Sequence, residues 1–215
     1  MDFSNEDLEW FEQLYDVVME ANARMNLTRI TDREEFFAKH IVDSALPFFI
    51  VPALVELPGT LRAADLGSGA GFPGFVLARL NPGWNFALIE RTQKKARYLN
   101  EACKRLELKN VHVVAKDAKE AGIAKCHLIV ARAVGPLAKV AHTAAPLLKR
   151  RGLLVHYKGG GLREDEIAEG FRAGRKLGLI QDDPVGYRIP PKGDARTLVI
   201  SRSIGQRRGA AHRGS

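Results

Sequence analysis

The stretch ADLGSGAGFPGF (residues 64–75) places four glycines within eight residues. It matches G-x-G-x-G from Gly67 and the dinucleotide-binding pattern G-x-G-x-x-G from Gly69. An apolar run, LRAADL (61–66), precedes it and a helical pattern near 73–81 follows, so we expect a strand-to-helix turn, where doubly wound sheets place their ligand crevice. Glycine lets the backbone turn sharply there and lets a ligand approach closely. Because a tight turn without a ligand also needs glycine, the pattern alone does not name a ligand.

Beyond residue 61, short apolar runs alternate with helical patterns. The runs are LRAADL (61–66), WNFALIE (84–90), VHVVAK (111–116), HLIVAR (127–132) and GLLVHYK (152–158), and the helical patterns lie near 73–81, 92–107, 136–149 and 163–177. This alternation is typical of parallel strands joined by helical crossovers. The segment VGYRIPPKGDARTLVISRS (185–203) predicts an antiparallel hairpin at the sheet edge. We therefore predict an α/β fold with a three-layer, Rossmann-like sheet of seven strands, mostly parallel, whose last strand is antiparallel.

The first third of the chain predicts helices. Apolar residues recur at helical spacing through the first 20 residues. TDRE (31–34) matches a capping box, in which the Thr31 hydroxyl and the Glu34 carboxylate satisfy backbone donors at the start of a helix that extends through Leu46. Pro47 then marks the end of this helix.

Composition divides the chain further. We expect a helical N-terminal extension over residues 1–58, an α/β ligand-binding domain over 59–204 and a disordered basic tail over 205–215. Residues 1–23 hold seven acids and no Lys or Arg, so the remainder must carry +15 to give the net charge of +8. Such a surplus suits a polyanion, because neutralised phosphates release their condensed counterions. A basic enzyme with a solvated surface accounts for the composition equally well.

Several classes of protein are disfavoured. The two cysteines, Cys103 and Cys126, form no C-x-x-C pair and have no histidine at metal spacing, so we expect neither a disulfide framework nor a metal site. The opening residues lack the basic start and apolar segment of an export signal. The most apolar window, ALPFFIVPALV (45–55), is too short to span a bilayer. We therefore expect a cytoplasmic protein without a membrane segment.

Acidic residues stand at the ends of the first three expected strands. They are Asp65 before the glycines, Glu90 after the second strand and Asp117 after the third. S-adenosylmethionine carries an ammonium, a ribose diol and an adenine amine but no pyrophosphate, so it favours acceptors on successive strand ends. Glu90 alone suits NAD as well, and singly these acids fit a solvated strand end or a turn. Because the three acids end successive strands at the edge where the glycine loop lies, together they favour S-adenosylmethionine.

Further motifs extend this pattern over nearly the whole chain. They are MNLTRI (25–30), KHIVDSALP (39–47), ADLGSGAGFPG (64–74), ERTQKKARYL (90–99), Arg132-Ala133 and Lys158-Gly159. With them the chain resembles class I S-adenosylmethionine-dependent methyltransferases, and among these the bacterial 16S ribosomal RNA guanine-N7 methyltransferase family, ribosomal small subunit methyltransferase G, also called glucose-inhibited division protein B. The Phe-Pro-Gly ending of the loop, Asn-Leu-Thr and Lys-His-Ile-x-Asp-Ser are specific to that family, whereas the glycines alone indicate only the superfamily.

The resemblance implies a cofactor site. Gly67, Gly69 and Phe72 are expected to line S-adenosylmethionine, with Glu90 on the ribose. The full expected set is Asp65, Gly67, Gly69, Phe72, Glu90, Asp117, Ala118, Lys119 and Arg132. Asp117, Ala118 and Lys119 are expected to flank the adenine. The family usually has Arg-Ala-Glu or a close variant where this chain has DAKE (117–120), so the adenine contacts depart from the family pattern.

The end of the fourth strand, ARAVGPL (131–137), bears on the reaction. It lacks the Asn/Asp-Pro-Pro-aromatic motif of enzymes that methylate exocyclic amines. Neither cysteine is placed as the nucleophile of pyrimidine C5 methylation, and Arg132 stands where ribose methyltransferases commonly carry Asp. Guanine N7 has an in-plane lone pair and no proton, so its methylation needs no base and depends on positioning, which contributes on the order of 7–11 kcal/mol.

Three residues are candidates for the acceptor site. Arg132 can donate to guanine O6 or to phosphate, or form an ordinary ion pair at the strand end. Lys158, before three glycines, can meet phosphate or remain solvated. His40 lies near Asp43 and Ser44 on one expected helix, which suggests a hydrolase triad, but this helix offers no oxyanion hole, so helix packing or RNA contact fits better.

A basic set follows the second strand. It comprises Arg91, Lys94, Lys95, Arg97, Lys104 and Arg105. Its members suit an RNA backbone track or, more simply, the exposed face of one helix.

These observations lead to one hypothesis: a monomeric, cytoplasmic S-adenosylmethionine-dependent enzyme that makes N7-methylguanosine in the decoding region of 16S ribosomal RNA, acting on that RNA or on the small ribosomal subunit. Its specific target rests on the resemblance. Two alternatives stay open, a methyltransferase for a small metabolite and a non-catalytic RNA-binding or cell-division protein with a vestigial loop.

Overall fold

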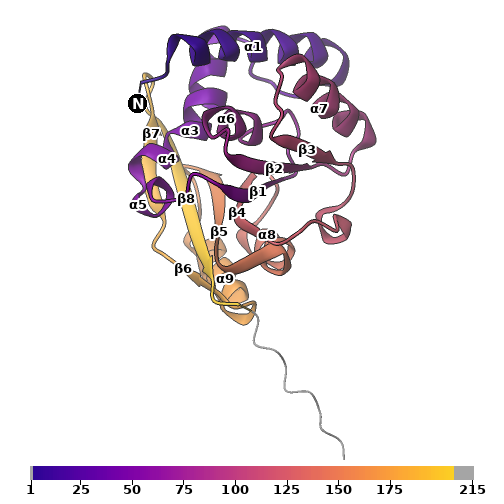
Figure 1. The fold of residues 1–215 in the computed structure, drawn as a ribbon. Coiled ribbons are helices and arrows are strands. Elements are labelled where there is room, and N and C mark those ends of the chain that lie inside the picture. The colour runs from indigo at the N-terminus through magenta and orange to yellow at the C-terminus, as the bar shows by residue number, and fades with distance from the viewer. Residues whose placement is uncertain (1, 206–215) are drawn as a thin grey trace, which may run out of the picture.

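The computed structural model describes residues 2–205, so the basic tail expected over 205–215 lies, apart from Gly205, outside the described residues. A single mixed sheet forms the middle layer (Figure 1). Its strands are β1 (Leu61–Leu66), β2 (Trp84–Ile89), β3 (Val111–Val114), β4 (Cys126–Arg132), β5 (Leu148–Gly159), β6 (Leu179–Gln181), β7 (Val185–Ile189) and β8 (Asp194–Ser203). None of the described helices is long and apolar enough to cross a bilayer.

The strand order is β3-β2-β1-β4-β5-β8-β6, with β7 also paired to β8. The strands β1 to β5 are parallel, whereas β8 runs antiparallel to β5, β6 and β7. The predicted α/β fold, with a mostly parallel sheet and an antiparallel last strand, is confirmed. Strand order reverses at β1, which lies between β2 and β4, and a ligand crevice opens at the carboxyl ends of strands at such a point.

Two details of the sheet differ from expectation. The described sheet has one strand more than the seven predicted. This additional strand is β6, which is only three residues long and follows a helix after one glycine turn. The helix expected near 136–149 is shorter: α8 (Leu137–Ala144) ends before Pro146, and β5 already begins at Leu148. Proline lacks the amide that a continuing helix requires.

Helices cover both faces of the sheet (Figure 1). One face carries α1 (Asn5–Met25), α6 (Gly74–Leu80) and α7 (Gln93–Arg105), and the other carries α8 and α9 (Glu164–Lys176). Successive strand residues point to opposite faces, so Phe86 and Leu88 join the first apolar cluster while Ala87 and Ile89 join the second. Burial of both faces explains why the strands are nearly continuous apolar runs.

The N-terminal helices belong to the first of these clusters. After α1 come α2 (Arg33–Phe36), the π-helical turn η1 (Phe37–Val42), α3 (Asp43–Ala45), α4 (Pro47–Ile50) and α5 (Pro52–Val55). Phe11 and Phe36 are fully buried together with Phe75 of α6. The extension therefore shares a core with the sheet, and the division into 1–58 and 59–204 stays a prediction.

The cap of α2 corrects the expected capping box. The Asp32 carboxylate, not the Thr31 hydroxyl, accepts from the amide of Glu35 at 2.8 Å, and the helix begins at Arg33. A carboxylate is the better cap because its charge complements the positive end of the helix dipole. Thr31 contributes its carbonyl, which accepts from the Tyr15 hydroxyl at 2.9 Å.

The acids of α1 meet bases of the neighbouring helices. Arg79 of α6 contacts Glu6 at 3.0 Å and Asp7 at 2.9 Å, and Arg105 of α7 contacts Glu20 at 2.8 Å. The acidic N-terminal segment thus neutralises part of the cationic remainder of the chain.

The correction at Asp32 is testable. We expect Asp32→Ala to lower the free energy of unfolding by about 1 kcal/mol, because the Glu35 amide loses its acceptor. Thr31→Ala serves as the control and should change it by less than about 0.5 kcal/mol. Urea unfolding followed by circular dichroism measures both, and a larger loss for Thr31→Ala would restore the original capping box.

Candidate active site

The glycine loop connects β1 to α6. The amides of Gly67 and Ser68 both donate to the carbonyl of Ile89, at 2.8 and 3.2 Å, so the loop is bonded to the end of β2. Gly67, Gly69 and Gly71 have positive φ values of 66°, 57° and 101°. A Cβ at Gly71 would collide with the ring of Phe75, so glycine is required there for space as well as for conformation.

Asp65 lies beneath this loop. Its side chain is fully buried, Oδ2 accepts from the Gly74 amide at 2.9 Å, and Oδ1 has no partner within residues 2–205. Burial raises the pKa of Asp65 to about 7, against the lowering effect of the Gly74 amide. Asp65 thus holds the start of α6 against the end of β1.

Glu90 joins the loops that follow β1 and β2. Its Oε2 accepts from the Gly69 amide at 3.1 Å and its Oε1 from the Thr92 amide at 2.8 Å. The residue is 6% exposed. Each carboxylate oxygen retains a lone pair, so Glu90 is fixed in place and can still accept hydrogen bonds from a diol.

A first cavity, here called the cofactor cavity, has a volume of about 400 Å³. It brings together five residues of the expected cofactor set, which are Gly67, Glu90, Asp117, Ala118 and Lys119. Leu66, Ile89, Val134 and Val140 supply apolar wall. Asp117 also caps the short 3-10 helix η2 (Ala118–Glu120) through Oδ1, which accepts from the Lys119 amide at 3.0 Å.

These residues fit S-adenosylmethionine. A Cβ at Gly67 would come within 3.2 Å of Val134 Cγ2, so bare backbone borders the cavity there. Acceptors from Glu90 and Asp117 suit a ribose diol and an adenine amine, and the apolar wall suits a purine face. The remaining expected residues, Asp65, Gly69, Phe72 and Arg132, do not line this cavity.

A second cavity, here called the acceptor cavity, has a volume of about 540 Å³ and is also lined by Ala133, so the two cavities adjoin. It brings together all three candidates for the acceptor site, His40, Arg132 and Lys158. Asp43, Glu166 and Arg196 line it as well.

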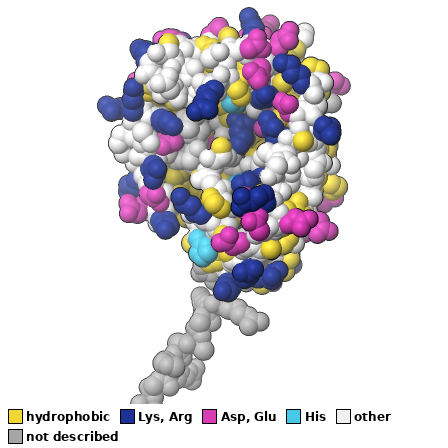
Figure 2. Space-filling view, turned by 180° about the vertical axis from the view of Figure 1, so that it is seen from behind, with side chains coloured by type: hydrophobic (Ala, Val, Ile, Leu, Met, Phe, Trp, Pro, Cys, Tyr) yellow, Lys and Arg dark blue, Asp and Glu magenta, His cyan; other side chains and the backbone are white. Residues whose placement is uncertain are grey.

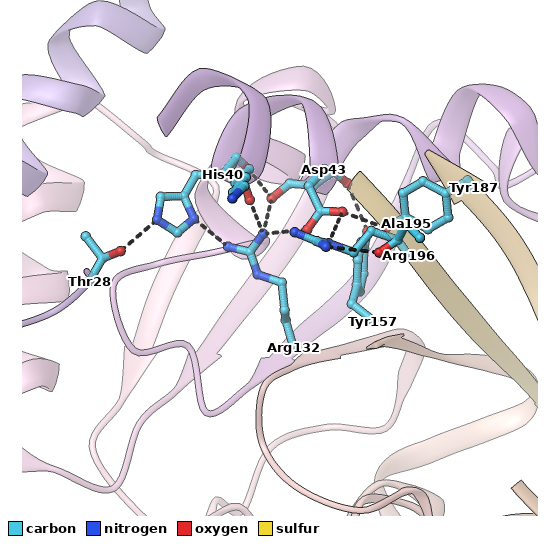
Figure 3. A network of polar contacts seen from close by, with 10 residues as sticks. Thr28, His40, Asp43, Arg132, Tyr157, Tyr187, Ala195 and Arg196 are labelled. Atoms are coloured by element: carbon cyan, nitrogen blue, oxygen red, sulfur yellow. Dashed lines mark hydrogen bonds and ion pairs between the residues drawn. The ribbon is translucent and has the colours of Figure 1, made fainter. Parts of the chain in front are cut away.

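Arg132 is held by the N-terminal helices (Figure 3). Its Nη1 donates to the carbonyl of Lys39 at 3.1 Å and to Asp43 Oδ2 at 3.2 Å, with Ser44 Oγ at 3.5 Å. Its Nη2 donates to His40 Nδ1 at 3.2 Å. The ordinary ion pair considered for Arg132 is therefore present. Nε–H and the second Nη2–H have no acceptor in the described chain, and they form one edge of the guanidinium.

Asp43 is the centre of this network. Besides Arg132, its carboxylate accepts from the Tyr187 hydroxyl at 2.7 Å and lies 3.6 Å from Arg196 Nε. It is 3% exposed and joins α3 to β4, β7 and β8 (Figure 3). Sequence analysis placed Asp43 in the KHIVDSALP stretch and in the rejected triad, but nothing in the chain order points to partners as distant as Tyr187.

His40 has partners at both ring nitrogens. Its Nδ1 accepts from Arg132, so Nε2 carries the proton and donates to Thr28 Oγ1 at 3.0 Å. Burial and the Arg132 charge lower the pKa of His40 to about 3. Its ring stacks on Phe72, with centroids 4.5 Å apart. Ser44 Oγ donates to the His40 carbonyl rather than to its ring, so the three residues form no triad.

Lys158 forms an ion pair with Glu166 of α9, Nζ to Oε1, at 2.7 Å. It also contacts the Gly135 carbonyl at 3.4 Å, and Glu166 Oε1 accepts from the Leu137 amide at 3.2 Å. Lys158 is therefore not simply solvated. Sequence analysis missed Glu166 and Arg196, which lie outside every motif, whereas Lys39 stood within the KHIVDSALP stretch.

The basic set does not form one continuous track. Arg91 and Lys95 line the cofactor cavity, whereas Lys94 donates to the Arg24 carbonyl and Arg105 pairs with Glu20, both on α1. Five of the six residues lie on α7, and Arg91 precedes it. The RNA backbone track stays a prediction.

Comparison with known proteins identifies the family. Residues 7–183 match the model of the family described as GidB, rRNA small subunit methyltransferase G. The chain belongs to this family. It is 35% identical over 209 residues to ribosomal RNA small subunit methyltransferase G of Lachnoclostridium phytofermentans, covering 95% of this chain and 84% of that protein. It is 36% identical to the protein of the same name from Microcystis aeruginosa, covering 83% and 87%. The expected class, an S-adenosylmethionine-dependent rRNA methyltransferase, is confirmed.

Solved structures show the same fold at low identity. Fibrillarin of Aeropyrum pernix with natively bound S-adenosyl-L-methionine has a TM-score of 0.56 at 17% identity, covering 74% of this chain and 72% of that one. A mutant of MtNAS in complex with S-adenosylmethionine has a TM-score of 0.58 at 14% identity, covering 90% and 75%. Both likenesses support the assigned fold.

The buried Asp65 predicts a pH dependence. Because its pKa is raised from 3.8 to about 7, the folded protein retains a proton that the unfolded chain releases. Its contribution to stability is complete below about pH 4 and is lost as the pH rises through 7. We expect wild type to lose on the order of 4 kcal/mol relative to Asp65→Asn between pH 4 and 8.

Urea unfolding at several pH values measures this difference. Asp183→Asn, at an exposed site, is the control and should follow wild type at every pH. If the free energy of unfolding changed with pH in the same way for wild type and Asp65→Asn, Asp65 would have an ordinary pKa.

Proposed function

We propose that this protein transfers the methyl group of S-adenosylmethionine to N7 of a guanine in 16S ribosomal RNA. One observation supports this most: a cavity lined by the glycine loop after β1 and by acceptors at the ends of β2 and β3 adjoins, at Ala133, a cavity lined by cationic side chains. Membership of the rRNA methyltransferase family supports the class of acceptor.

The chain's own residues would hold the cofactor from three sides. Glu90 would accept the ribose hydroxyls, because the Gly69 and Thr92 amides already fix its carboxylate. The free oxygen of Asp117 would accept from the adenine amine, and Lys119 would lie beside the ring. Gly67 would leave its backbone open to the amino-acid part. Asp65 would contribute to cofactor binding indirectly, by supporting the glycine loop.

The reaction needs no proton transfer. Bound S-adenosylmethionine supplies an electrophilic methyl group. Guanine N7 carries no proton and offers an in-plane lone pair. His40 is already committed at both ring nitrogens, to Arg132 and Thr28, and is not a base for the reaction. The residues of the acceptor cavity therefore act by orienting the base and excluding water, and such positioning can supply a large part of the rate.

Arg132 would position the RNA. The protein occupies three of its five N–H groups and leaves the Nε–Nη2 edge for a ligand. Two parallel donors on a planar group suit a phosphate or guanine O6. Phe72 lies beneath the guanidinium, 5.5 Å from ring centroid to Cζ, so Phe72 serves Arg132 rather than the cofactor cavity.

The acceptor would be free 16S RNA or the small ribosomal subunit, bound by a monomer of this chain in the cytoplasm. Lys and Arg side chains are spread over the face seen in Figure 2, interspersed with Asp and Glu. The +15 carried outside the first 23 residues is compatible with a polyanionic partner.

Labelled methyl transfer tests this function. Undermodified small subunits, free 16S RNA and large subunits are incubated with the protein, and the nucleosides are then identified by mass spectrometry. We expect label in N7-methylguanosine from the small subunit or its RNA. Label on a ribose or on the large subunit would refute the proposal, and transfer to a small acceptor alone would support the metabolite alternative.

The role of Arg132 is tested by Arg132→Lys. Lysine keeps the charge opposite the buried Asp43 but lacks the Nε–Nη2 edge. We expect kcat/KM for RNA to fall about 100-fold, while the Kd for S-adenosylmethionine, measured by calorimetry, changes less than about threefold.

Arg202→Lys, at an exposed site on β8, is the matched control and should keep wild-type activity. Equal losses of cofactor binding and transfer in Arg132→Lys would instead place Arg132 in the cofactor site.

A further inference from the structure

Two carboxylates line the acceptor cavity, Asp43 and Glu166. Both oxygens of Asp43 are occupied, Oδ2 by Arg132 and Oδ1 by Tyr187 and Arg196. Its side chain is 4% exposed, so Asp43 has little room to meet a ligand. Glu166 differs on both points.

Glu166 keeps one oxygen free. Its Oε1 meets Lys158 Nζ at 2.7 Å and the Leu137 amide at 3.2 Å, whereas Oε2 has no partner among residues 2–205. Its side chain is 20% exposed. These contacts fix the carboxylate from two elements, β5 and the start of α8, and leave Oε2 as an oriented acceptor in the cavity.

Lys158 adds a donor beside this acceptor. Of its three N–H groups, one meets Glu166 and one approaches the Gly135 carbonyl at 3.4 Å. The third has no acceptor within the described part of the chain. The pair thus offers a ligand one cationic N–H and one carboxylate oxygen, held close together.

This pattern complements one edge of guanine. Its Watson–Crick edge presents the O6 acceptor next to the N1–H and N2–H donors, and it lies away from the N7 lone pair. We propose that Lys158 donates to O6 and that Glu166 Oε2 accepts from the N1–H and N2–H donors, so that this pair selects guanine. The inference rests on the proposed function, because it places the accepting base in this cavity.

The charge of Glu166 also suits the reaction. When the N7 lone pair forms the new N–C bond, the S–C bond electrons return to sulfur, and the positive charge moves from sulfur to the purine. No proton leaves. A carboxylate bonded to N1–H and N2–H then faces a base that is becoming cationic, and such charge-assisted bonds are stronger than neutral ones.

Glu166 has a structural contact as well, since it accepts from the Leu137 amide at the start of α8. A simple loss of activity in a variant would therefore not distinguish recognition from support. Discrimination between two bases does, because a purely structural defect lowers transfer to both equally. Inosine is the suitable second base, because it keeps O6, N7 and N1–H and lacks only the N2 amine.

The experiment compares guanosine and inosine at the accepting position. That position is introduced by splinted ligation into 16S RNA and reconstituted into small subunits. We expect wild type to prefer guanosine by about tenfold or more in kcat/KM, and Glu166→Gln to reduce this ratio to within about twofold. Lys158→Met, which removes the ion pair but not the carboxylate, should lower kcat/KM and keep the ratio.

The outcomes separate the two proposals. Absence of N7-methylguanosine with wild type refutes the proposed function. Transfer by wild type with a guanosine-to-inosine ratio near one, or an unchanged ratio in Glu166→Gln, refutes only the role of Glu166. Because a wild-type ratio near one already refutes the role of Glu166, the test holds even where a variant fails to fold. Calorimetry with S-adenosylmethionine checks that each variant retains its cofactor site.

Discussion

The buried contact between Asp43 and Arg132 is the interaction on which the arrangement of the acceptor cavity depends. Two charges removed from water are costly, and the cost is recovered only where new hydrogen bonds and ion pairs replace the lost water. Here Tyr187 and Arg196 complete the shell of Asp43, and His40 and a main-chain carbonyl hold the Nη groups of Arg132, whose Nε–Nη2 edge stays open. The network ties the N-terminal helices to three strands. The same contacts therefore form the wall of the acceptor cavity and hold the N-terminal extension against the sheet.

The same principle organises the cofactor side. Both oxygens of the buried Glu90 and Oδ2 of the fully buried Asp65 accept from main-chain amides of the glycine loop, the start of α6 and the loop after β2. Amide donors fix a carboxylate without using a second side chain. These bonds tie the loop to β2 and α6 without a ligand, and such preorganisation lowers the entropic cost of binding.

The sequence was informative where structure follows from local pattern. Alternating apolar runs predicted β1 to β5, and the loop with Glu90 and Asp117 predicted one cavity, because strand ends meet at one edge of a parallel sheet. The short β6 carried too few residues to show a period. His40, Asp43 and Ser44 were correctly placed near one another, yet their relation depends on Arg132, 89 residues beyond Asp43. Glu166 belongs to a helix with an ordinary acidic first turn, and only the tertiary fold turns it toward Lys158.

Ala133 has a further consequence. It adopts φ 58°, uncommon for a residue with a Cβ, and among residues 2–205 it alone lines both cavities. A short bridge would therefore suffice to join an adenosine to a purine in a single inhibitor. The second half of such a compound would meet Lys39, His40 and Asp43, which the N-terminal helices contribute to the acceptor cavity.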